Sequence, residues 1–190
     1  MRIISGSARG RQLSPLRGAD IRPTPDRVRE ALFSMLISRL GSLAGLRVLD
    51  LFAGSGALAL EALSRGAASA ILIDQGSQAA RVIPANIMTC GMQERTTFIR
   101  SDVLKTLPRL VGSLFDLVFL DPPYGQGLVP PVLTALTELN LLAPKGLICA
   151  ETDRRDDLPD AIGPLTRFDL RHYASTAVHL FSYPEGESKF

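Results

Sequence analysis

The stretch LDPPYG, residues 120–125, places an acid, two prolines and a tyrosine directly after the apolar run FDLVF. Pro122 and Pro123 fix φ and remove two backbone donors, so neighbouring carbonyl groups are held in a stiff geometry. The Asp121 carboxylate accepts hydrogen bonds. The ring of Tyr124 offers a face on which a flipped-out base can stack, worth roughly 1–3 kcal/mol. Together these residues could hold a planar amine.

Holding an amine in this way has a chemical use, because the lone pair of an exocyclic amine is delocalised into its base and is a poor nucleophile. If the Asp121 carboxylate and the Pro122 carbonyl each accept one N–H, the lone pair can be aimed at an electrophile. A fixed carboxylate also stabilises the positive charge that develops on nitrogen. A simple proline-rich turn with a packed tyrosine would explain the prolines, but not the acid and the ring together. Residues 121–124 are therefore the predicted catalytic group.

A second motif, VLDLFAGSGALAL, places Gly54 and Gly56 between a predicted strand and a predicted helix. Glycines there let a ligand approach the backbone, and the N–H groups of the helix start face outward. Glycines that serve only the turn would give the same pattern. Asp74, however, ends the next predicted strand about 20 residues on, where an acid can hold ribose hydroxyls. The pattern favours a nucleotide-like cofactor.

Two cofactor classes fit this loop. Gly54, Gly56 and Ala59 satisfy the G-x-G-x-x-G/A pattern of dinucleotide sites. Asp50, however, stands at the end of the same strand, where it would repel a pyrophosphate and attract a cation. S-adenosylmethionine carries an ammonium and a sulfonium, so Asp50 favours this methyl donor. Asp50 could instead be a solvated or turn-capping acid.

Asp102 is a further acid at the end of a predicted strand. It follows the stretch FIR, from which it is separated by one serine. It could accept from an adenine amino group while the backbone of Val103 recognises the ring edge. Asp102 could equally cap the helix that follows. Both roles remain open on the sequence.

The elements that position these motifs alternate between strand and helix, which is typical of a parallel sheet with helices on both faces. The last segment, RFDLRHYASTAVHLFSY, holds two strands joined by AST, too short for a crossover, so they are expected to pair antiparallel. We therefore predict a Rossmann-like α/β fold with a mostly parallel seven-stranded sheet and a C-terminal antiparallel hairpin. Strands are expected at 47–52, 69–74, 96–100, 115–121 and 146–151, and helices at 56–66, 77–90, 103–110 and 132–139.

The first 40 residues are predicted to be a basic extension, a small β-hairpin followed by a helix, and residues 41–190 a catalytic core within one domain. Thr24 could cap that helix. Residues 1–29 hold seven arginines and two aspartates, while the net charge of the whole chain is +2. This asymmetry suits a polyanion such as RNA, although a solvated charged surface would look the same.

Composition places few further limits. The 190 residues are 46% hydrophobic, which suits one globular domain. The chain lacks a signal-peptide pattern and any apolar run near the roughly 20 residues of a membrane span. Cys90 and Cys149 lie far apart without metal-ligand spacing. We expect a soluble, cytoplasmic, monomeric protein without a metal.

DLFAGSGAL with DPPY resembles the class I S-adenosylmethionine-dependent methyltransferases that act on amino nitrogens. More narrowly, RPTPDRVREALF, FAGSGALALEALSRGA and DPPY together resemble the bacterial RsmD family, which methylates the exocyclic N2 of a guanine in 16S ribosomal RNA. The likeness covers nearly the whole chain. D-P-P-Y alone does not separate guanine N2 from adenine N6, cytosine N4 or glutamine N5.

The resemblance implies roles for individual residues. Arg9 and Arg11 would contact RNA in a small-subunit particle, and residues 22–24, including Arg22 and Thr24, would close over the site. Residues 121–124 would hold the guanine, and Asp121 would also border the cofactor. The remaining S-adenosylmethionine-binding residues would be Asp50, Phe52, Ala53, Gly54, Gly56, Asp74, Asp102 and Val103. The sequence departs from the family at Ala59, where glycine is common, at Asp74, where glutamate is usual, and in SGSARGR, which lacks an aromatic residue before R-G-R.

Other functions remain as alternatives. The nearest are a DNA adenine-N6 or a protein glutamine-N5 methyltransferase of the same fold. An NAD-linked oxidoreductase is disfavoured by Asp50 and by the position of the two histidines, His172 and His179, in the predicted C-terminal hairpin. A non-catalytic RNA-binding module is the third alternative.

Overall fold

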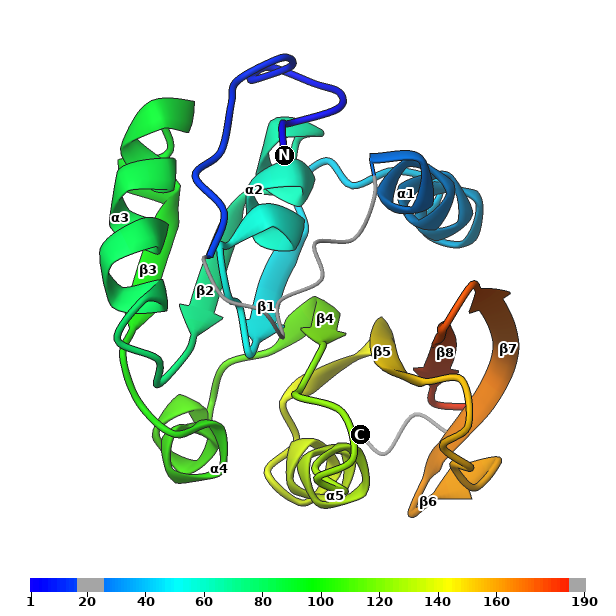
Figure 1. Ribbon diagram of the computed structural model, residues 1–190. Helices are drawn as coiled ribbons and strands as arrows, with labels where there is room; N and C mark the ends of the chain where they lie inside the picture. The colour runs from blue at the N-terminus through cyan, green and yellow to red at the C-terminus, as the bar shows by residue number, and fades with distance from the viewer. Residues whose placement is uncertain (17–25, 185–190) are drawn as a thin grey trace. The chain divides into compact units, whose positions relative to one another are not determined.

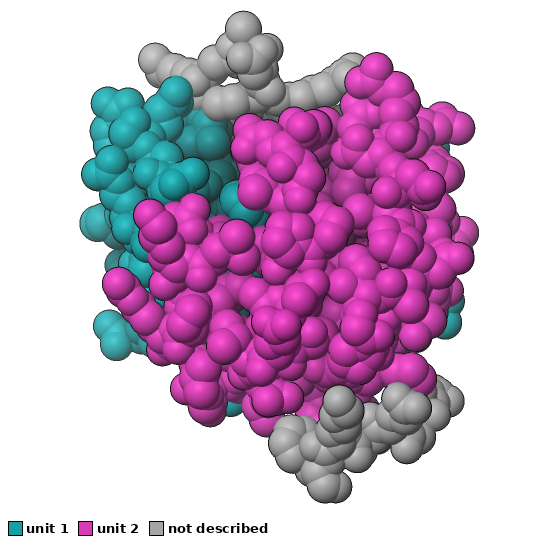
Figure 2. All heavy atoms as spheres, turned by 90° about the horizontal axis from the view of Figure 1, so that it is seen from below, with its two compact units in different colours: residues 1–101 teal, residues 102–190 magenta. Residues whose placement is uncertain are grey.

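The computed structural model describes residues 1–16 and 26–184 (Figure 1), and the chain divides into two compact units, residues 1–101 and 102–190 (Figure 2). Thr24, the predicted helix cap, and Arg22 lie outside the described residues. No helix in the two described ranges is long and apolar enough to cross a membrane.

The first unit holds three parallel strands in the order β3-β2-β1. Strands β1 and β2 are short and mostly apolar, as expected for strands buried on both faces, whereas β3 lies at the edge and is only partly buried. Helix α2 packs on β1 and β2, and α3 packs on β3 (Figure 1). The elements are α1 (Asp26–Leu40), β1 (Arg47–Leu51), α2 (Ala57–Ser64), β2 (Ser69–Ile73), α3 (Ala79–Cys90), the 3-10 turn η1 (Gln93–Arg95) and β3 (Thr96–Ile99).

The second unit holds five strands in the order β4-β5-β8-β7-β6. Strands β4 and β5 are parallel and joined through α5, whereas β8, β7 and β6 pair antiparallel. The elements are α4 (Val103–Thr106), the 3-10 turn η2 (Leu107–Leu110), β4 (Phe115–Leu120), α5 (Val129–Glu138), β5 (Leu142–Asp153), β6 (Ala161–Ile162), β7 (Leu165–Tyr173) and β8 (Thr176–Ser182).

The predicted mixed α/β fold, with mostly parallel strands and an antiparallel C-terminal hairpin, is confirmed. The predicted number of seven strands is one too low, because residues 161–162 pair with β7 as a short additional strand. Helix α5 begins three residues before the predicted start, since Pro130 and Pro131 fit a first helical turn, where their missing N–H groups have no intrahelical partner.

The predicted N-terminal hairpin is present only as an antiparallel bridge between Arg2 and Gln12. Hydrogen bonds between backbone groups join its two ends. In one of them Ile3 N donates to the Arg11 carbonyl at 3.0 Å. The two N–H groups that follow Ile3, those of Ile4 and Ser5, are taken by a side chain of α2 instead. The segment therefore lies on α2 rather than forming a two-stranded ribbon.

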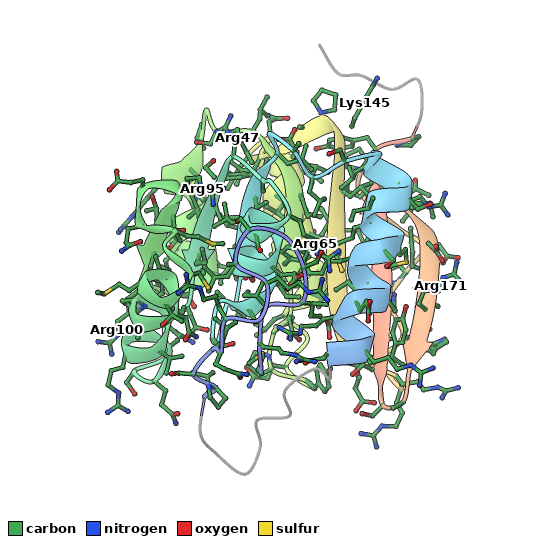
Figure 3. All side chains as sticks on the ribbon, turned by 90° about the horizontal axis from the view of Figure 1, so that it is seen from above. Arg47, Arg65, Arg95, Arg100, Lys145 and Arg171 are labelled. Carbon is green, nitrogen blue, oxygen red and sulfur yellow. The ribbon has the colours of Figure 1, made fainter. Side chains whose placement is uncertain are left out.

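That side chain is Glu61, which is fully buried. Its carboxylate accepts from Ile4 N at 2.7 Å, from Ser5 N at 3.0 Å and from Arg65 Nε at 2.7 Å. Arg65 (labelled in Figure 3) also lies over the Phe33 ring, 4.8 Å from its centroid. A buried charge is tolerated only when it is paired and hydrogen-bonded, and Glu61 meets both conditions.

Helical spacing in this part of the sequence predicts a stripe of Val28, Leu32, Met35, Leu36 and Arg39, but α1 buries a somewhat different face. Its buried residues are Arg29, Leu32, Phe33 and Leu36.

Arg29 is buried because it bridges the start of α1 and the N-terminal segment. It donates to the Arg2 carbonyl at 2.6 Å and to Asp26 Oδ1 at 2.7 Å. Partial burial acts to raise the pKa of Asp26, but the hydrogen bonds and charges of Arg29 and Arg2 outweigh it, so this pKa lies below its ordinary value.

Replacing Glu61 by alanine should lower the free energy of unfolding by about 2–4 kcal/mol, because it leaves a partly buried guanidinium and two partly buried N–H groups without their acceptor. Urea denaturation followed by circular dichroism measures this loss. Glu138→Ala, at an exposed helix end, is the matched control and should change the same quantity by less than about 0.5 kcal/mol. Equal losses in the two variants would show that the Glu61 bonds do not hold the segment.

Candidate active site

The loop between β1 and α2 has an unusual backbone. Phe52, Gly54 and Gly56 have φ values of 62°, 58° and 76°. Glycine adopts this left-handed region freely, whereas phenylalanine does so at a cost of order 1 kcal/mol. Such strain persists only where the surroundings over-determine the backbone, and it concentrates at binding sites. The predicted glycine loop is therefore a shaped structure and not only a turn.

Asp74, directly after β2, fixes this loop. Its Oδ2 accepts from Gly54 N at 2.8 Å, and its Oδ1 accepts from Gly76 N at 2.7 Å. The parallel register, with Leu51 opposite Ile73, brings the ends of β1 and β2 together and makes the first bond possible. Each carboxylate oxygen can accept more than one hydrogen bond, so Asp74 keeps the capacity to bind hydroxyl groups.

Asp50 lies inside the first unit and is only 2% exposed, so it is not a solvated acid. Its Oδ2 accepts from Ala59 N, in the first turn of α2, at 3.2 Å. This bond stabilises the helix start, where a negative charge is favoured. The sequence left open a capping role and a cation-attracting role for Asp50. The capping role is confirmed, and the attraction of a cation remains a prediction. Ala59 itself is completely buried.

Asp102 also caps a helix. Its Oδ1 accepts from Lys105 N at 3.0 Å, and its carbonyl accepts from Thr106 N at 3.1 Å and from the Thr106 hydroxyl at 2.8 Å. The capping prediction is therefore confirmed. Val103 follows as the buried first residue of α4. The predicted contacts of Asp102 and Val103 with an adenine ring remain a prediction.

The D-P-P-Y stretch follows β4, as predicted. Desolvation by burial raises the pKa of Asp121 from the ordinary 3.8 to about 6. The folded protein thus holds the Asp121 proton more tightly than the unfolded chain does. Ionisation of this group therefore lowers the stability of the fold as the pH rises from about 4 through about 6. A carboxyl group kept under such a penalty is characteristic of functional sites.

Tyr124 is 43% exposed, and its hydroxyl shares a hydrogen bond of 3.0 Å with Thr176 Oγ1 at the start of β8. Burial, followed by the charges of Asp121, Glu151 and Asp153, outweighs this hydrogen bond and raises the pKa of Tyr124 to about 12. The phenol therefore stays neutral at any physiological pH. One face of the ring can remain available while its edge is held.

A pocket of about 260 Å³ opens beside Tyr124. This volume lies just below the roughly 300 Å³ at the small end of ligand sites, and it suits a single planar ring better than a whole dinucleotide. The lining includes three acids, Glu151, Asp156 and Asp157. The other lining residues are Pro122, Pro123, Tyr124, Gly125, Gly127, Leu128, Val129, Pro130, Thr152 and Leu158.

The wall that contains Leu158 is held by Arg167 on β7. The guanidinium of Arg167 donates to the Leu158 carbonyl at 3.0 Å and forms an ion pair with Asp160. It also lies 3.1 Å from His179 Nδ1. Since an arginine only donates, Nδ1 of His179 is the acceptor.

The protonation of His179 follows from this contact. The proton of the neutral ring sits on Nε2, 3.0 Å from the hydroxyl oxygen of Thr152, a pocket residue. Burial first, and the charge of Arg167 second, lower the pKa of His179 to about 4, in agreement with a neutral ring. His179 is therefore a structural residue behind the pocket, as expected of the histidines in this hairpin.

The structure places the predicted residues in two groups. Asp50, Phe52, Ala53, Gly54, Gly56 and Asp74 belong to the first unit, and Asp102, Val103 and residues 121–124 to the second. A single crevice shared by the two groups remains a prediction. Arg9 and Arg11 are exposed, in agreement with an RNA-contacting role, while Arg22 and Thr24 lie outside the described residues.

Several residues of the site were not predicted from the sequence. Thr176 contacts the pocket residue Tyr124 across 52 residues of sequence, and Arg167 contacts the pocket residue Leu158 across nine, and no local pattern indicates either contact. Leu16 lies close to Gly54. A Cβ atom placed on this glycine would be 3.5 Å from Leu16 Cδ1. Asn86 could have been found, since it is a polar residue on the apolar face of α3 that also carries Ile83 and Ile87.

In the described ranges, no group of three or more His, Cys, Asp or Glu side chains could hold a metal ion. Cys90 and Cys149 are both free and buried.

Solved structures define the class of protein. A structure of Escherichia coli yhhF, described as a candidate methyltransferase, is 33% identical and superimposes with a TM-score of 0.83 over 96% of this chain and 97% of that one. Together with the glycine loop and the D-P-P-Y stretch, this similarity identifies the fold as that of the class I methyltransferases.

The family follows from sequence comparison. Residues 1–182 match the family described as Conserved hypothetical protein 95. Ribosomal RNA small subunit methyltransferase D of Escherichia coli (strain K12) is 37% identical over 84% of this chain and 78% of its own length. The Haemophilus influenzae protein of the same name is also 37% identical, over 81% of this chain and 79% of its own length. The chain belongs to the RsmD family of methyltransferases.

Gly56→Ala should destabilise the protein more than a positive φ alone explains. The new Cβ would lie 2.9 Å from Leu72 Cδ2, in a buried site, at a φ of 76°. Gly10→Ala is the matched control, because Gly10 has a φ of 83° but no atom within 4 Å of the new Cβ. We expect Gly10→Ala to cost about 1 kcal/mol and Gly56→Ala about 1–3 kcal/mol more, measured by urea denaturation. Equal losses would mean that close packing of α2 on β2 does not require this glycine.

Proposed function

We propose that this protein transfers a methyl group from S-adenosylmethionine to the exocyclic N2 of a guanine in 16S ribosomal RNA of the small subunit. The observation that carries the proposal is that Pro122, Pro123 and Tyr124 line a pocket of about 260 Å³ and directly follow Asp121, an acid whose pKa is raised to about 6. Membership of the RsmD family, with relatives named as ribosomal RNA small subunit methyltransferases, supports the RNA substrate.

The residues of the first unit fit the methyl donor, whose positively charged sulfonium supplies the transferable methyl group. The left-handed backbone at Gly54 and Gly56 gives the loop its fixed shape. Asp74 holds the loop amide of Gly54 and still has lone pairs for ribose hydroxyls. Asp50 adds a buried negative charge, which suits a cation and opposes a pyrophosphate.

The residues of the second unit would prepare the amine. The Asp121 carboxylate accepts one N–H and the Pro122 carbonyl the other, which aims the nitrogen lone pair at the methyl group. As the new C–N bond forms, the bond from the methyl group to sulfur would break and S-adenosylhomocysteine would leave. Positive charge then appears on nitrogen, and the adjacent carboxylate stabilises it. Asp121 can then take the proton that the nitrogen releases, because a pKa of about 6 lets the group bind a proton and return it to water near neutral pH.

The pocket supports guanine as the base. Carboxylates accept hydrogen bonds but cannot donate them when ionised, so a lining that includes Glu151, Asp156 and Asp157 favours a ring edge rich in donors. The Watson–Crick edge of guanine offers donors at N1 and N2, whereas adenine offers one acceptor and one amino group. Tyr124, held at its hydroxyl by Thr176, provides the stacking face for a base turned out of its helix.

The direct test of this function is nucleoside mass spectrometry. Small ribosomal subunits lacking the modification are incubated with the protein and methyl-labelled S-adenosylmethionine, and the RNA is digested. Labelled N2-methylguanosine is expected. Labelled N6-methyladenosine, or label found only in a protein glutamine, would reject the proposal in favour of another methyltransferase of the same fold.

Asp121→Ala should lower kcat by about 10²–10³-fold, because the acceptor that stabilises the developing charge is lost. S-adenosylhomocysteine affinity should change little. In the wild type, the rate should rise with pH through about 6 and then level, since only the ionised carboxylate performs this role.

Asp121→Asn is the matched control for the charge. It keeps an acceptor oxygen but cannot titrate, so a slower enzyme without the step at pH 6 is expected. A wild-type profile that is flat between pH 5 and 8, or an unchanged kcat in the alanine variant, would remove Asp121 from the mechanism.

The double variant with Arg9 and Arg11 changed to alanine should bind the RNA with a weaker salt dependence. Loss of two phosphate contacts should reduce the slope of log K against log salt by about 1.5. Filter binding between 50 and 300 mM KCl measures it. The control is a double variant with Lys145 and Arg171 (labelled in Figure 3) changed to alanine, which removes the same charge from the second unit and should leave the slope unchanged. An equal reduction in both would place the RNA surface elsewhere.

A further inference from the structure

Asn86 is a buried polar residue to which the proposed mechanism gives no role. It lies in the middle of α3 and is 1% exposed. A buried amide is costly unless its hydrogen-bonding groups are satisfied, and none of the partners recorded for its side chain lies in its own helix. Its position is therefore explained by what it joins.

The side chain of Asn86 reaches two different segments. Its Oδ1 accepts from Ser14 N at 2.8 Å, and its Nδ2 donates to the Ser14 carbonyl at 3.0 Å. This pair of bonds resembles the pairing of two strands, with the amide taking the place of a neighbouring backbone. Nδ2 also donates to the Ser55 carbonyl at 2.9 Å, which occupies its second hydrogen.

Each of these segments belongs to a different binding region. Ser55 lies between Gly54 and Gly56 in the proposed cofactor loop. Ser14 follows the exposed arginines proposed to bind RNA, Arg9 and Arg11. The same segment then brings Leu16 to within van der Waals distance of the Cβ position of Gly54. The N-terminal segment and the loop are thus joined twice within the first unit, by a polar link and by an apolar contact.

We infer that Asn86 is a positioning residue that couples the RNA-binding segment to the cofactor loop, so that RNA and cofactor strengthen each other's binding. The inference depends on the proposed function, which assigns the two ligands. RNA that fixes the segment also fixes Ser14, and through Asn86 the Ser55 carbonyl of the loop. By thermodynamic linkage, cofactor that fixes the loop must raise RNA affinity by the same factor.

The test measures this coupling factor. The dissociation constant of unmodified small ribosomal subunits is determined by filter binding with and without saturating S-adenosylhomocysteine. In the wild type the cofactor product should tighten binding at least about fivefold. In Asn86→Ala the factor should fall below about twofold, because the link between Ser14 and Ser55 is gone. A variant that keeps the wild-type factor, or a wild type without coupling, would overturn the inference.

Ser64→Ala is the matched control for a merely structural effect. The Ser64 hydroxyl accepts from Ala8 N and donates to the Ser5 carbonyl, so it also fastens the N-terminal segment to the first unit, but none of these bonds involves the glycine loop. It should lower stability and leave the coupling factor at the wild-type value. Loss of coupling in this control as well would show that loosening of the segment is enough and that Asn86 has no special role.

A second variant and a second measurement protect the test against misfolding. Asn86→Asp keeps the acceptor for Ser14 N but offers no hydrogen to Ser55 when ionised, and it should also lose the coupling. In the wild type alone, S-adenosylhomocysteine should slow amide hydrogen exchange at residues 12–16, and unchanged exchange there would contradict the inference. If the wild type binds no S-adenosylhomocysteine at all, the proposed function fails. If it binds normally but independently of RNA, only this inference fails.

Discussion

The hydrogen bond from Gly54 N to the Asp74 carboxylate is the interaction on which the proposed cofactor site depends. It joins the loop after β1 to the end of β2, and the parallel register of these strands is what brings donor and acceptor together. With Asp50 holding the first turn of α2, two strand-end carboxylates define the path of the loop. The strained backbone of Phe52 can persist because both ends of the loop are fixed.

Both units use buried polar groups at some cost to stability. In the first, Glu61 and Asn86 bind the N-terminal segment through its backbone, which a purely apolar surface could not align so specifically. In the second, the neutral His179 and the Arg167 guanidinium support the wall of the pocket. Asp121 is the exception. Desolvation raises its pKa, and no opposite charge in the described part of the chain acts to lower it again. A raised carboxyl pKa of this kind is characteristic of functional sites.

The sequence predicted the strands, the helices and the local motifs well, because these depend on apolar periodicity and on glycine and proline positions. It did not predict the short β6, whose two residues carry no periodic signal. The N-terminal hairpin was predicted from local pattern, but Glu61, far along the chain, takes two of its N–H groups. Thr176 contacts Tyr124 across 52 residues, and Arg167 contacts Leu158 through the fold of the chain between them, and no local spacing indicates either contact. The family resemblance supplied the reaction, which spacing alone left open among several amines.

The central claim is that the carboxylates at the ends of β1 and β2 shape a loop for a cationic methyl donor and not for a dinucleotide. Isothermal titration calorimetry of the purified protein with S-adenosylmethionine and, separately, with NAD tests this claim most directly. The account predicts saturable one-to-one binding of S-adenosylmethionine and no heat of binding with NAD. Saturable binding of NAD without binding of S-adenosylmethionine would contradict it.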